Sequence, residues 1–137
     1  MNAADRMPSS PSILLVDDER SVCELTGTIL ELNGFKVSRA MSGGEALQLF
    51  EQAPERFGLL VADVMMPIMS GPTLVQRLRS HHPTLPVLFV SGLVSQHNFE
   101  GTLGGWFLQK PYSSSLLVRK VREILNAPSP VMRLPSR

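Results

Sequence analysis

The sequence predicts a doubly wound α/β domain built on a parallel sheet. Short apolar runs alternate with longer segments in which apolar residues recur every three or four positions, the spacings of strands and helices respectively. Two of the runs, at residues 59–62 and 87–90, are apolar throughout, which is typical of parallel strands covered on both faces. Regular alternation of this kind favours a sheet with helices on both sides.

The first part of the pattern is an apolar strand at residues 12–16, a helix over 19–33 and an alternating, half-buried strand over 35–40. Asn33 and Gly34 form a stop signal for the helix. The apolar residues that recur along this helix are Val22, Leu25, Ile29 and Leu32.

A second helix is expected to begin at residues 42–45. Ser42 is suited to cap its first turn, and Glu45, three residues on, completes the pattern of a capping box. This helix is expected to stop before Pro54. Its expected buried residues are Ala46, Leu47 and Phe50.

The second part of the pattern continues with a helix over 71–82, the strand at 87–90, a last strand at 106–109 and a final helix over 113–126. The segment 95–105 contains three glycines and has little helical pattern, so a helix there would be short or irregular. The residues expected to face inward are Leu74, Val75 and Leu78 in the first of these helices, and Leu117, Val121 and Ile124 in the last.

The composition is that of one globular domain. The chain has 137 residues, of which 43% are hydrophobic, so it can bury a sizeable core. We expect a folded unit over 12–126, and disordered tails over 1–11 and 127–137, which are rich in polar residues and proline. Cys23 is the only cysteine and cannot form an internal disulfide, which favours a reducing compartment.

Charge and hydropathy argue against two classes of function. The formal net charge is +1, from 13 basic and 12 acidic residues with no concentrated basic block, so nucleic-acid binding is not expected. No apolar stretch approaches the roughly 18 residues of a membrane span, and the polar first twelve residues lack the apolar core of a signal peptide. We therefore expect a cytoplasmic protein without membrane insertion.

Several reactive side chains follow the apolar runs directly. Asp17 and Asp18 come after the first strand, and Asp63 after the third. Ser91 comes after the fourth strand and Lys110 after the last. The carboxyl ends of parallel strands meet at one edge of a sheet, where doubly wound folds bind their ligands. Carboxylates crowded there repel one another unless a cation or proton intervenes, which indicates a metal and phosphate centre.

Phosphoryl transfer with magnesium is the chemistry that suits this set. Mg²⁺ prefers oxygen ligands, which Asp17, Asp18 and Asp63 can supply, and no cluster of His and Cys suggests zinc. Lys110 and the Ser91 hydroxyl can each bind a phosphate oxygen. Asp63 then remains as the nucleophile, since carboxylates can accept a phosphoryl group as aspartyl phosphates.

Four separated motifs resemble the receiver domain of two-component response regulators. They are Ile-Leu-Leu-Val-Asp-Asp-Glu at 13–19, Asp63 followed by Met66-Pro67 and Ser70-Gly71, Ser91-Gly92, and Lys110-Pro111. The resemblance covers nearly all of the expected folded unit. It implies a flavodoxin-like, five-stranded parallel sheet in the order 2-1-3-4-5. The amino-acid sequences at 70–72, 88–92 and 107–112 are similar to those of the C-terminal receivers of hybrid histidine kinases, which suggests a phosphorelay.

The resemblance also implies a role for each matching position. Asp63 would accept a phosphoryl group from a phosphohistidine of a histidine kinase or phosphotransfer protein. Mg²⁺ would be held by Asp17, Asp18, Asp63 and the backbone carbonyl of Met65. Ser91 would be the switch hydroxyl, Lys110 would bind a phosphoryl oxygen, Phe107 would be the switch aromatic, and the bond before Pro111 would be cis.

Three features qualify the resemblance. The segment between Ser91 and Lys110 is short and glycine-rich, so a fourth helix would be short or irregular, and the expected state is a monomer or weak dimer. Phe107 cannot form the hydrogen bond of a tyrosine, so burial should favour its inward position. Met65 and Leu93 would flank the phosphoryl group, and we hypothesise that their apolar side chains hinder the attacking water.

The resulting interpretation is a receiver that is phosphorylated at Asp63, is not a turnover enzyme on an external substrate, and regulates a downstream protein or passes the phosphoryl group on. The alternative is a phosphorylation-independent scaffold of the same fold, which would have no need of the acidic set or Lys110. An aspartate-nucleophile phosphatase would carry a second Asp two residues after Asp17, where this chain has Glu19. A flavin-binding fold would carry a Ser/Thr/Gly phosphate loop after the first strand, which is missing here.

Overall fold

The structure is a computed structural model that describes residues 11–92 and 105–126. Its strands are β1 (Ser12–Val16), β2 (Lys36–Ala40), β3 (Phe57–Asp63), β4 (Val87–Ser91) and β5 (Trp106–Gln109). Its helices are α2 (Arg20–Leu32), α3 (Gly43–Gln52), the single 3₁₀ turn η1 (Pro54–Arg56), α4 (Gly71–Arg79) and α6 (Ser114–Asn126).

The five strands form one parallel sheet in the order β2-β1-β3-β4-β5, which confirms the expected topology. Because the chain leaves β1 for one edge and then returns to continue on the other side, β1 and β3 are neighbours at the point where the strand order reverses. The carboxyl ends of these two strands therefore lie side by side, which is where a doubly wound sheet places its ligand.

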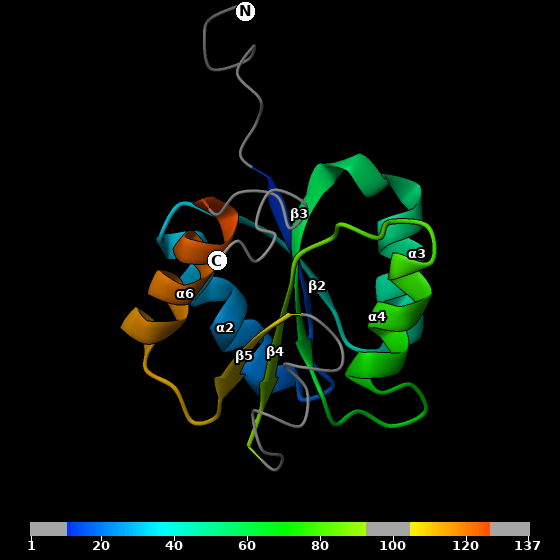
Figure 1. Ribbon diagram of the computed structural model, residues 1–137. Helices are drawn as coiled ribbons and strands as arrows, with labels where there is room; N and C mark the ends of the chain where they lie inside the picture. Colours follow the sequence, from blue (N-terminus) through cyan, green and yellow to red (C-terminus); the bar gives the residue numbers. More distant parts are fainter. Residues whose placement is uncertain (1–10, 93–104, 127–137) are drawn as a thin grey trace, which may run out of the picture.

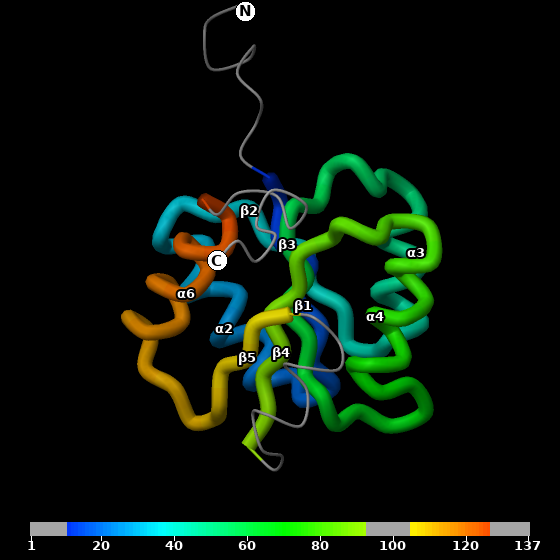
Figure 2. Tube along the Cα trace, in the orientation of Figure 1, coloured from blue at the N-terminus to red at the C-terminus, as the bar shows by residue number. Residues whose placement is uncertain are grey.

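Helices cover both faces of the sheet (Figure 1). Helices α2 and α6 lie on one side and α3 and α4 on the other, as the tube along the chain also shows (Figure 2). Each side has its own apolar core, because alternate residues of a strand point to opposite faces. All five residues of β1 and of β4 are buried, as expected for central strands of a covered parallel sheet.

Two elements differ from the expected length by three residues, and the others by at most two. Strand β3 extends over Phe57–Asp63 rather than 59–62, because pairing with β1 begins two residues earlier than the apolar run. Helix α4 ends at Arg79 rather than at 82. The amides of His81 and His82 both donate to the Leu78 carbonyl, so the chain turns before the histidines can extend the helix.

The capping box of α3 is present with a small shift. The Ser42 hydroxyl accepts from the Glu45 amide at 3.1 Å, as expected. The Glu45 carboxylate accepts from the Met41 amide at 2.8 Å, one residue before the cap. The box fixes the start of α3 next to the carboxyl end of β2.

The apolar stripe that marks α2 in the sequence is not its buried face. Leu25 is 62% exposed and Leu32 is 80% exposed. The residues of α2 that are buried are Cys23, Thr26, Gly27 and Leu30. Three of these four residues are small, which lets the helix lie close to the sheet, while Leu25 and Leu32 are left on the surface.

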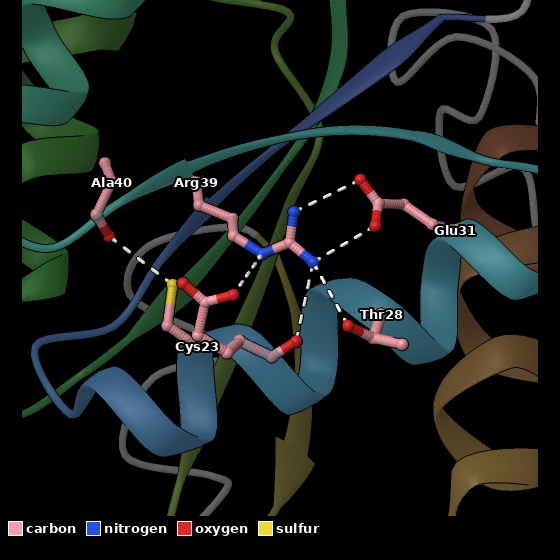
Figure 3. A network of polar contacts seen from close by, with 6 residues as sticks. Cys23, Thr28, Glu31, Arg39 and Ala40 are labelled. Atoms are coloured by element: carbon pink, nitrogen blue, oxygen red, sulfur yellow. Dashed lines mark hydrogen bonds and ion pairs between the residues drawn. The ribbon is translucent and has the colours of Figure 1, made fainter.

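An arginine joins the edge strand β2 to α2 (Figure 3). The Arg39 guanidinium donates from both Nη atoms to the Glu31 carboxylate at 3.1 Å, a two-pronged contact, and its Nη2 also reaches the Glu24 carbonyl at 3.4 Å. It lies flat against Gly27, where a Cβ atom would come within 2.4 Å of it. Since Ala40 is the only fully buried residue of β2, this contact holds a strand that has little apolar surface of its own.

Some expectations fall on residues that the structure does not describe. The short or irregular helix between Ser91 and Lys110 lies outside the described residues, and so do nearly all of the two expected tails. Among the described helices, none has the length and apolar character needed to cross a bilayer.

Candidate functional site

The register of the sheet places Asp17 and Asp63 next to each other. Val16 of β1 pairs with Ala62 of β3, and the two aspartates are the residues that follow. Asp17 is 2% exposed and Asp63 8% exposed, whereas Asp18 is exposed. The backbone holds the pair in place, since the Asp17 amide donates to the Ala40 carbonyl at 3.1 Å and the Val64 amide to the Val90 carbonyl at 3.0 Å.

The three carboxylates form a compact cluster. Asp17, Asp18 and Asp63 each contribute an oxygen, and these atoms lie within 4.8 Å of one another. An all-oxygen donor set with two buried carboxylates and one exposed carboxylate fits a hard divalent cation such as Mg²⁺, which keeps part of its water shell. The geometry expected from the strand ends is therefore present.

Burial raises the pKa of the Asp63 carboxyl, and the neighbouring charges of Asp17 and Asp18 add to this effect. The Lys110 ammonium and the Met65 amide act in the opposite direction, but they do not cancel it. The contacts within the protein thus do not fully offset the cost of burying the negative charge of Asp63. A bound cation would offset the remainder.

Lys110 reaches both buried carboxylates. Its Nζ lies 3.2 Å from Asp17 Oδ2 and 3.6 Å from Asp63 Oδ2. Burial of the ammonium opposes its charge, but the two aspartates outweigh this, so the pKa of Lys110 lies above its usual value. A fixed positive charge therefore stands beside Asp63 at neutral pH.

The strand ends also bring the other expected residues to this edge. Ser91 is buried at the end of β4, and its carbonyl accepts from the Lys110 amide at 3.0 Å. Phe107 is buried in β5 opposite Phe89, as expected for a ring without a polar group. The peptide bond between Lys110 and Pro111 is cis, as the resemblance implied.

The loop after β3 contributes Met65, whose amide donates to Asp63 Oδ1 at 3.3 Å. Its side chain is exposed on the rim of the site. Leu93, the second residue expected to flank a phosphoryl group, lies outside the described residues.

Gly71 packs against the backbone of the site, although the sequence identified it only as the start of a helix and as part of a receiver-like motif. Its amide donates to the Val64 carbonyl at 3.0 Å, and a Cβ atom at this position would lie 2.4 Å from the backbone oxygen of Asp63. The first turn of α4 thus packs directly on the main chain of Asp63. The presence of a glycine at the start of α4 was the available signal, but only the packing gives its reason.

A groove runs from the site along α2. It has a volume of about 460 Å³ and lies between α2 and the segment that joins β5 to α6. Its lining residues include Val22, Leu25 and Ile29 on one side and Lys110, Pro111 and Tyr112 on the other. The outward apolar stripe of α2 therefore leads to the lysine that contacts Asp63.

Residues 13–122 match the response regulator receiver domain family. The chain belongs to this family. The receiver domain is a component of two-component signalling, and the five-stranded sheet, the acidic cluster and Lys110 are arranged here on that fold.

Individual receivers are similar over most of the chain. The sensor kinase CckA of Brucella abortus is 37% identical over 125 residues, which are 89% of this chain and 13% of that protein. The response regulator SaeR of Staphylococcus aureus is 28% identical over 116 residues, which are 82% of this chain and 50% of that protein. The solved receiver domain of a hybrid histidine kinase CckA is 34% identical, with a TM-score of 0.73 over 84% of this chain and 99% of that one.

The chain thus spans from about an eighth to a half of these curated relatives. The similarity concerns their receiver portion. It agrees with the resemblance of the motif sequences to the receivers of hybrid histidine kinases.

Proposed function

We propose that this receiver domain accepts a phosphoryl group from a phosphohistidine onto Asp63, with magnesium, and that the modified domain regulates a protein partner or passes the group on. The observation that carries the proposal is the placement of Asp63 between the Lys110 ammonium at 3.6 Å and the carboxylates of Asp17 and Asp18. In the transfer, an Asp63 oxygen attacks phosphorus and the phosphorus–nitrogen bond to the donor imidazole breaks.

Asp63 suits the nucleophile better than its neighbours do. Asp17 is already committed, since its Oδ1 accepts from the Glu19 amide at 3.0 Å and its Oδ2 contacts Lys110 at 3.2 Å. The contacts of Asp63 are longer, at 3.3 Å to the Met65 amide and 3.6 Å to Lys110. The negative charge of the Asp63 carboxylate is therefore stabilised by weaker contacts than that of Asp17. The Asp63 carboxylate is also the one whose charge is lost when it becomes an acyl phosphate.

Magnesium would be held by Asp17, Asp18, Asp63 and the Met65 carbonyl. When bound, it would neutralise charge on the phosphoryl oxygens and on the carboxylates that surround them. Lys110 would bind a further phosphoryl oxygen, which its position within reach of both Asp17 and Asp63 supports.

Ser91 and Phe107 would couple the modification to the surface. They lie on the adjacent strands β4 and β5, where Phe107 pairs with Phe89, two residues before Ser91. A hydroxyl drawn to the phosphoryl group would favour one of two packings of this edge. A partner that binds one packing better than the other would then read the signal. A domain that works in this way changes its own state and is not a turnover enzyme.

The α2 groove supports a location for the phosphoryl donor. A donor must bring its histidine to Asp63, and the exposed Leu25 lies with the half-buried Val22 and Ile29 in the same groove as Lys110. An exposed apolar stripe of this length indicates an interaction surface. We therefore propose that the histidine kinase or phosphotransfer protein docks against α2.

The test is intact-protein mass after incubation with acetyl phosphate, with and without Mg²⁺, beside Asp63→Asn. We expect one added phosphoryl group that requires both Mg²⁺ and Asp63. If no mass is added, beryllofluoride binding measured by calorimetry separates a short-lived acyl phosphate from a scaffold that does not use Asp63. Absence of both reactions would overturn the proposal.

A further inference from the structure

A side-chain hydrogen bond joins α2 to the segment that carries Lys110. The Thr26 and Tyr112 hydroxyls lie 3.3 Å apart, although the two residues are 86 positions apart in the sequence. Thr26 is one of the few buried polar residues, on the inner face of α2. Tyr112 follows Lys110 by two residues and packs against the core on the same side of the sheet.

This bond is one of two polar contacts, among the described residues, that join this segment to α2 and the loop before it. The other is the ion pair between Lys110 Nζ and Asp17 Oδ2 at 3.2 Å, and Asp17 lies in the short loop between β1 and the start of α2 at Arg20. The Lys110–Tyr112 segment therefore contacts α2 and its leading loop at two points, one at the acidic cluster and one along the helix. With one contact the segment could still rotate about it. With two contacts the direction in which the Lys110 side chain leaves the backbone is fixed.

The ends of the segment are held separately. The Lys110 amide donates to the Ser91 carbonyl at 3.0 Å, and Ser113 caps α6 by accepting from the Leu116 amide at 3.1 Å. Between these anchors lie Pro111, which has no amide hydrogen to donate, and Tyr112. Among the described residues, the polar contact between the middle of this segment and α2 is therefore the one made by the Tyr112 hydroxyl.

We propose that Tyr112, held by Thr26, is a positioning residue that keeps the Lys110 ammonium aimed between Asp17 and Asp63. This inference rests on the proposed function, because it assigns a purpose to the position of the lysine. Its basis is the geometry of the two-point contact, and it does not require Tyr112 to touch the phosphoryl group. Since Tyr112 also lines the α2 groove, a molecule seated there would lie against the residue that sets the direction of Lys110.

The test uses near-isosteric variants that remove one hydroxyl at a time: Tyr112→Phe, Thr26→Val and the double variant. Thr26→Ser keeps the hydroxyl and serves as the matched control. The first measurement is the rate at which an amine-reactive acetylating reagent modifies Lys110 in the metal-free protein, followed by peptide mass spectrometry. Lys120, which pairs with Glu123 on α6 at 3.6 Å, is an internal reference in the same sample.

We expect Lys110 to be modified about two- to fivefold faster in Tyr112→Phe and Thr26→Val, the range of one modest hydrogen bond at this distance. The double variant should be no faster than either single variant, because both remove the same bond. Thr26→Ser should behave like the unmodified chain, and Lys120 should be unaffected in all variants.

The second measurement is beryllofluoride affinity at saturating Mg²⁺, which we expect to weaken about two- to fivefold in the same two variants and to return in Thr26→Ser. A lower unfolding midpoint with unchanged Lys110 modification and unchanged affinity would show a merely structural bond and overturn the inference. If the unmodified chain binds no beryllofluoride, the proposed function fails, while the metal-free modification rates still decide whether Tyr112 positions Lys110.

Discussion

The guanidinium of Arg39 occupies the space that a side chain at Gly27 would fill. A Cβ atom built on Gly27 lies 2.4 Å from Arg39 Cζ, Nε and Nη2. Gly27 is in the middle of α2, where a glycine is ordinarily unfavourable by roughly 0.5–1 kcal/mol relative to alanine. The glycine is therefore explained by its partner on β2 and not by the conformation of the helix.

This relationship predicts a change of sign. Gly27→Ala alone should lower the free energy of unfolding by about 1–2 kcal/mol, because the arginine must leave Glu31 and the Glu24 carbonyl. In an Arg39→Ala background the same substitution should raise it by about 0.5–1 kcal/mol, the gain in helix propensity. Urea unfolding of the four proteins measures both effects, and a destabilising Gly27→Ala in both backgrounds would contradict the assignment.

The same ion pair predicts a pH dependence. The Arg39 hydrogen bonds hold the pKa of the Glu31 carboxyl below its usual range. A depressed folded-state pKa contributes stability above the ordinary value of about 4.3, and this stability is lost as the pH falls through the folded-state value. The stability difference between the unmodified chain and Arg39→Gln should therefore shrink below about pH 4, as measured by urea unfolding from pH 3 to 7.

Asp63 should show the opposite sign in the metal-free protein. Burial raises the pKa of its carboxyl, so ionised Asp63 destabilises the fold, and this penalty is complete once the pH is above the folded-state value. Asp63→Asn should accordingly raise the unfolding midpoint at pH 7 in EDTA, and the gain should diminish as the pH falls and Asp63 takes up a proton. An Asp63→Asn midpoint at or below that of the unmodified chain at pH 7 would be inconsistent with this picture.

A substitution at Asp18 can test cation binding without disturbing the fold, because the Asp18 side chain is exposed. Asp18→Ala should change the metal-free stability by less than about 0.5 kcal/mol. Mg²⁺ should raise the unfolding midpoint of the unmodified chain by linkage, and much less so in Asp18→Ala. Thermal unfolding over a series of Mg²⁺ concentrations measures this, and an equal upward shift in both proteins would exclude Asp18 from the cation site.

Gly71→Ala should damage the site through its backbone. The added methyl group would meet the Asp63 carbonyl oxygen at 2.4 Å, and neither atom belongs to a flexible side chain that could move aside. We expect a loss of about 2–4 kcal/mol of stability, in the range of strain and overpacking. Gly44→Ala is the matched control, since its nearest neighbour is the Ser42 hydroxyl at 4.0 Å, and it should be neutral or stabilising.

The α2 surface offers a matched pair for donor docking. Leu25 lines the groove beside Lys110, whereas Leu32, a leucine of the same helix that is also exposed, is not among the groove residues. Leu25→Glu should slow transfer from a phosphohistidine protein at least tenfold, and Leu32→Glu much less. Labelling by acetyl phosphate should be the same in both, since that donor needs no docking surface, so slower acetyl phosphate labelling in Leu25→Glu would point to damage at Asp63.

The sequence by itself determined the sheet, most of its strand limits and the residues at its carboxyl edge. Periodicity and apolar runs report which residues face a core, and a strand followed directly by Asp or Lys places that side chain at one edge regardless of further detail. This is why the sequence alone predicts one shared site for Asp17, Asp18, Asp63, Ser91 and Lys110.

The tertiary structure decided the rest, because those features depend on contacts between residues far apart in the chain. Spacing showed that α2 is a helix but not that Leu25 and Leu32 face outward, since the small residues on its other face are chosen by proximity to the sheet. The reasons for Gly27 and Gly71 lie in atoms of Arg39 and Asp63, and the Thr26–Tyr112 bond spans 86 positions. A sequence pattern indicates the secondary structure and burial that each residue favours. Only the packed structure shows which distant residues it contacts.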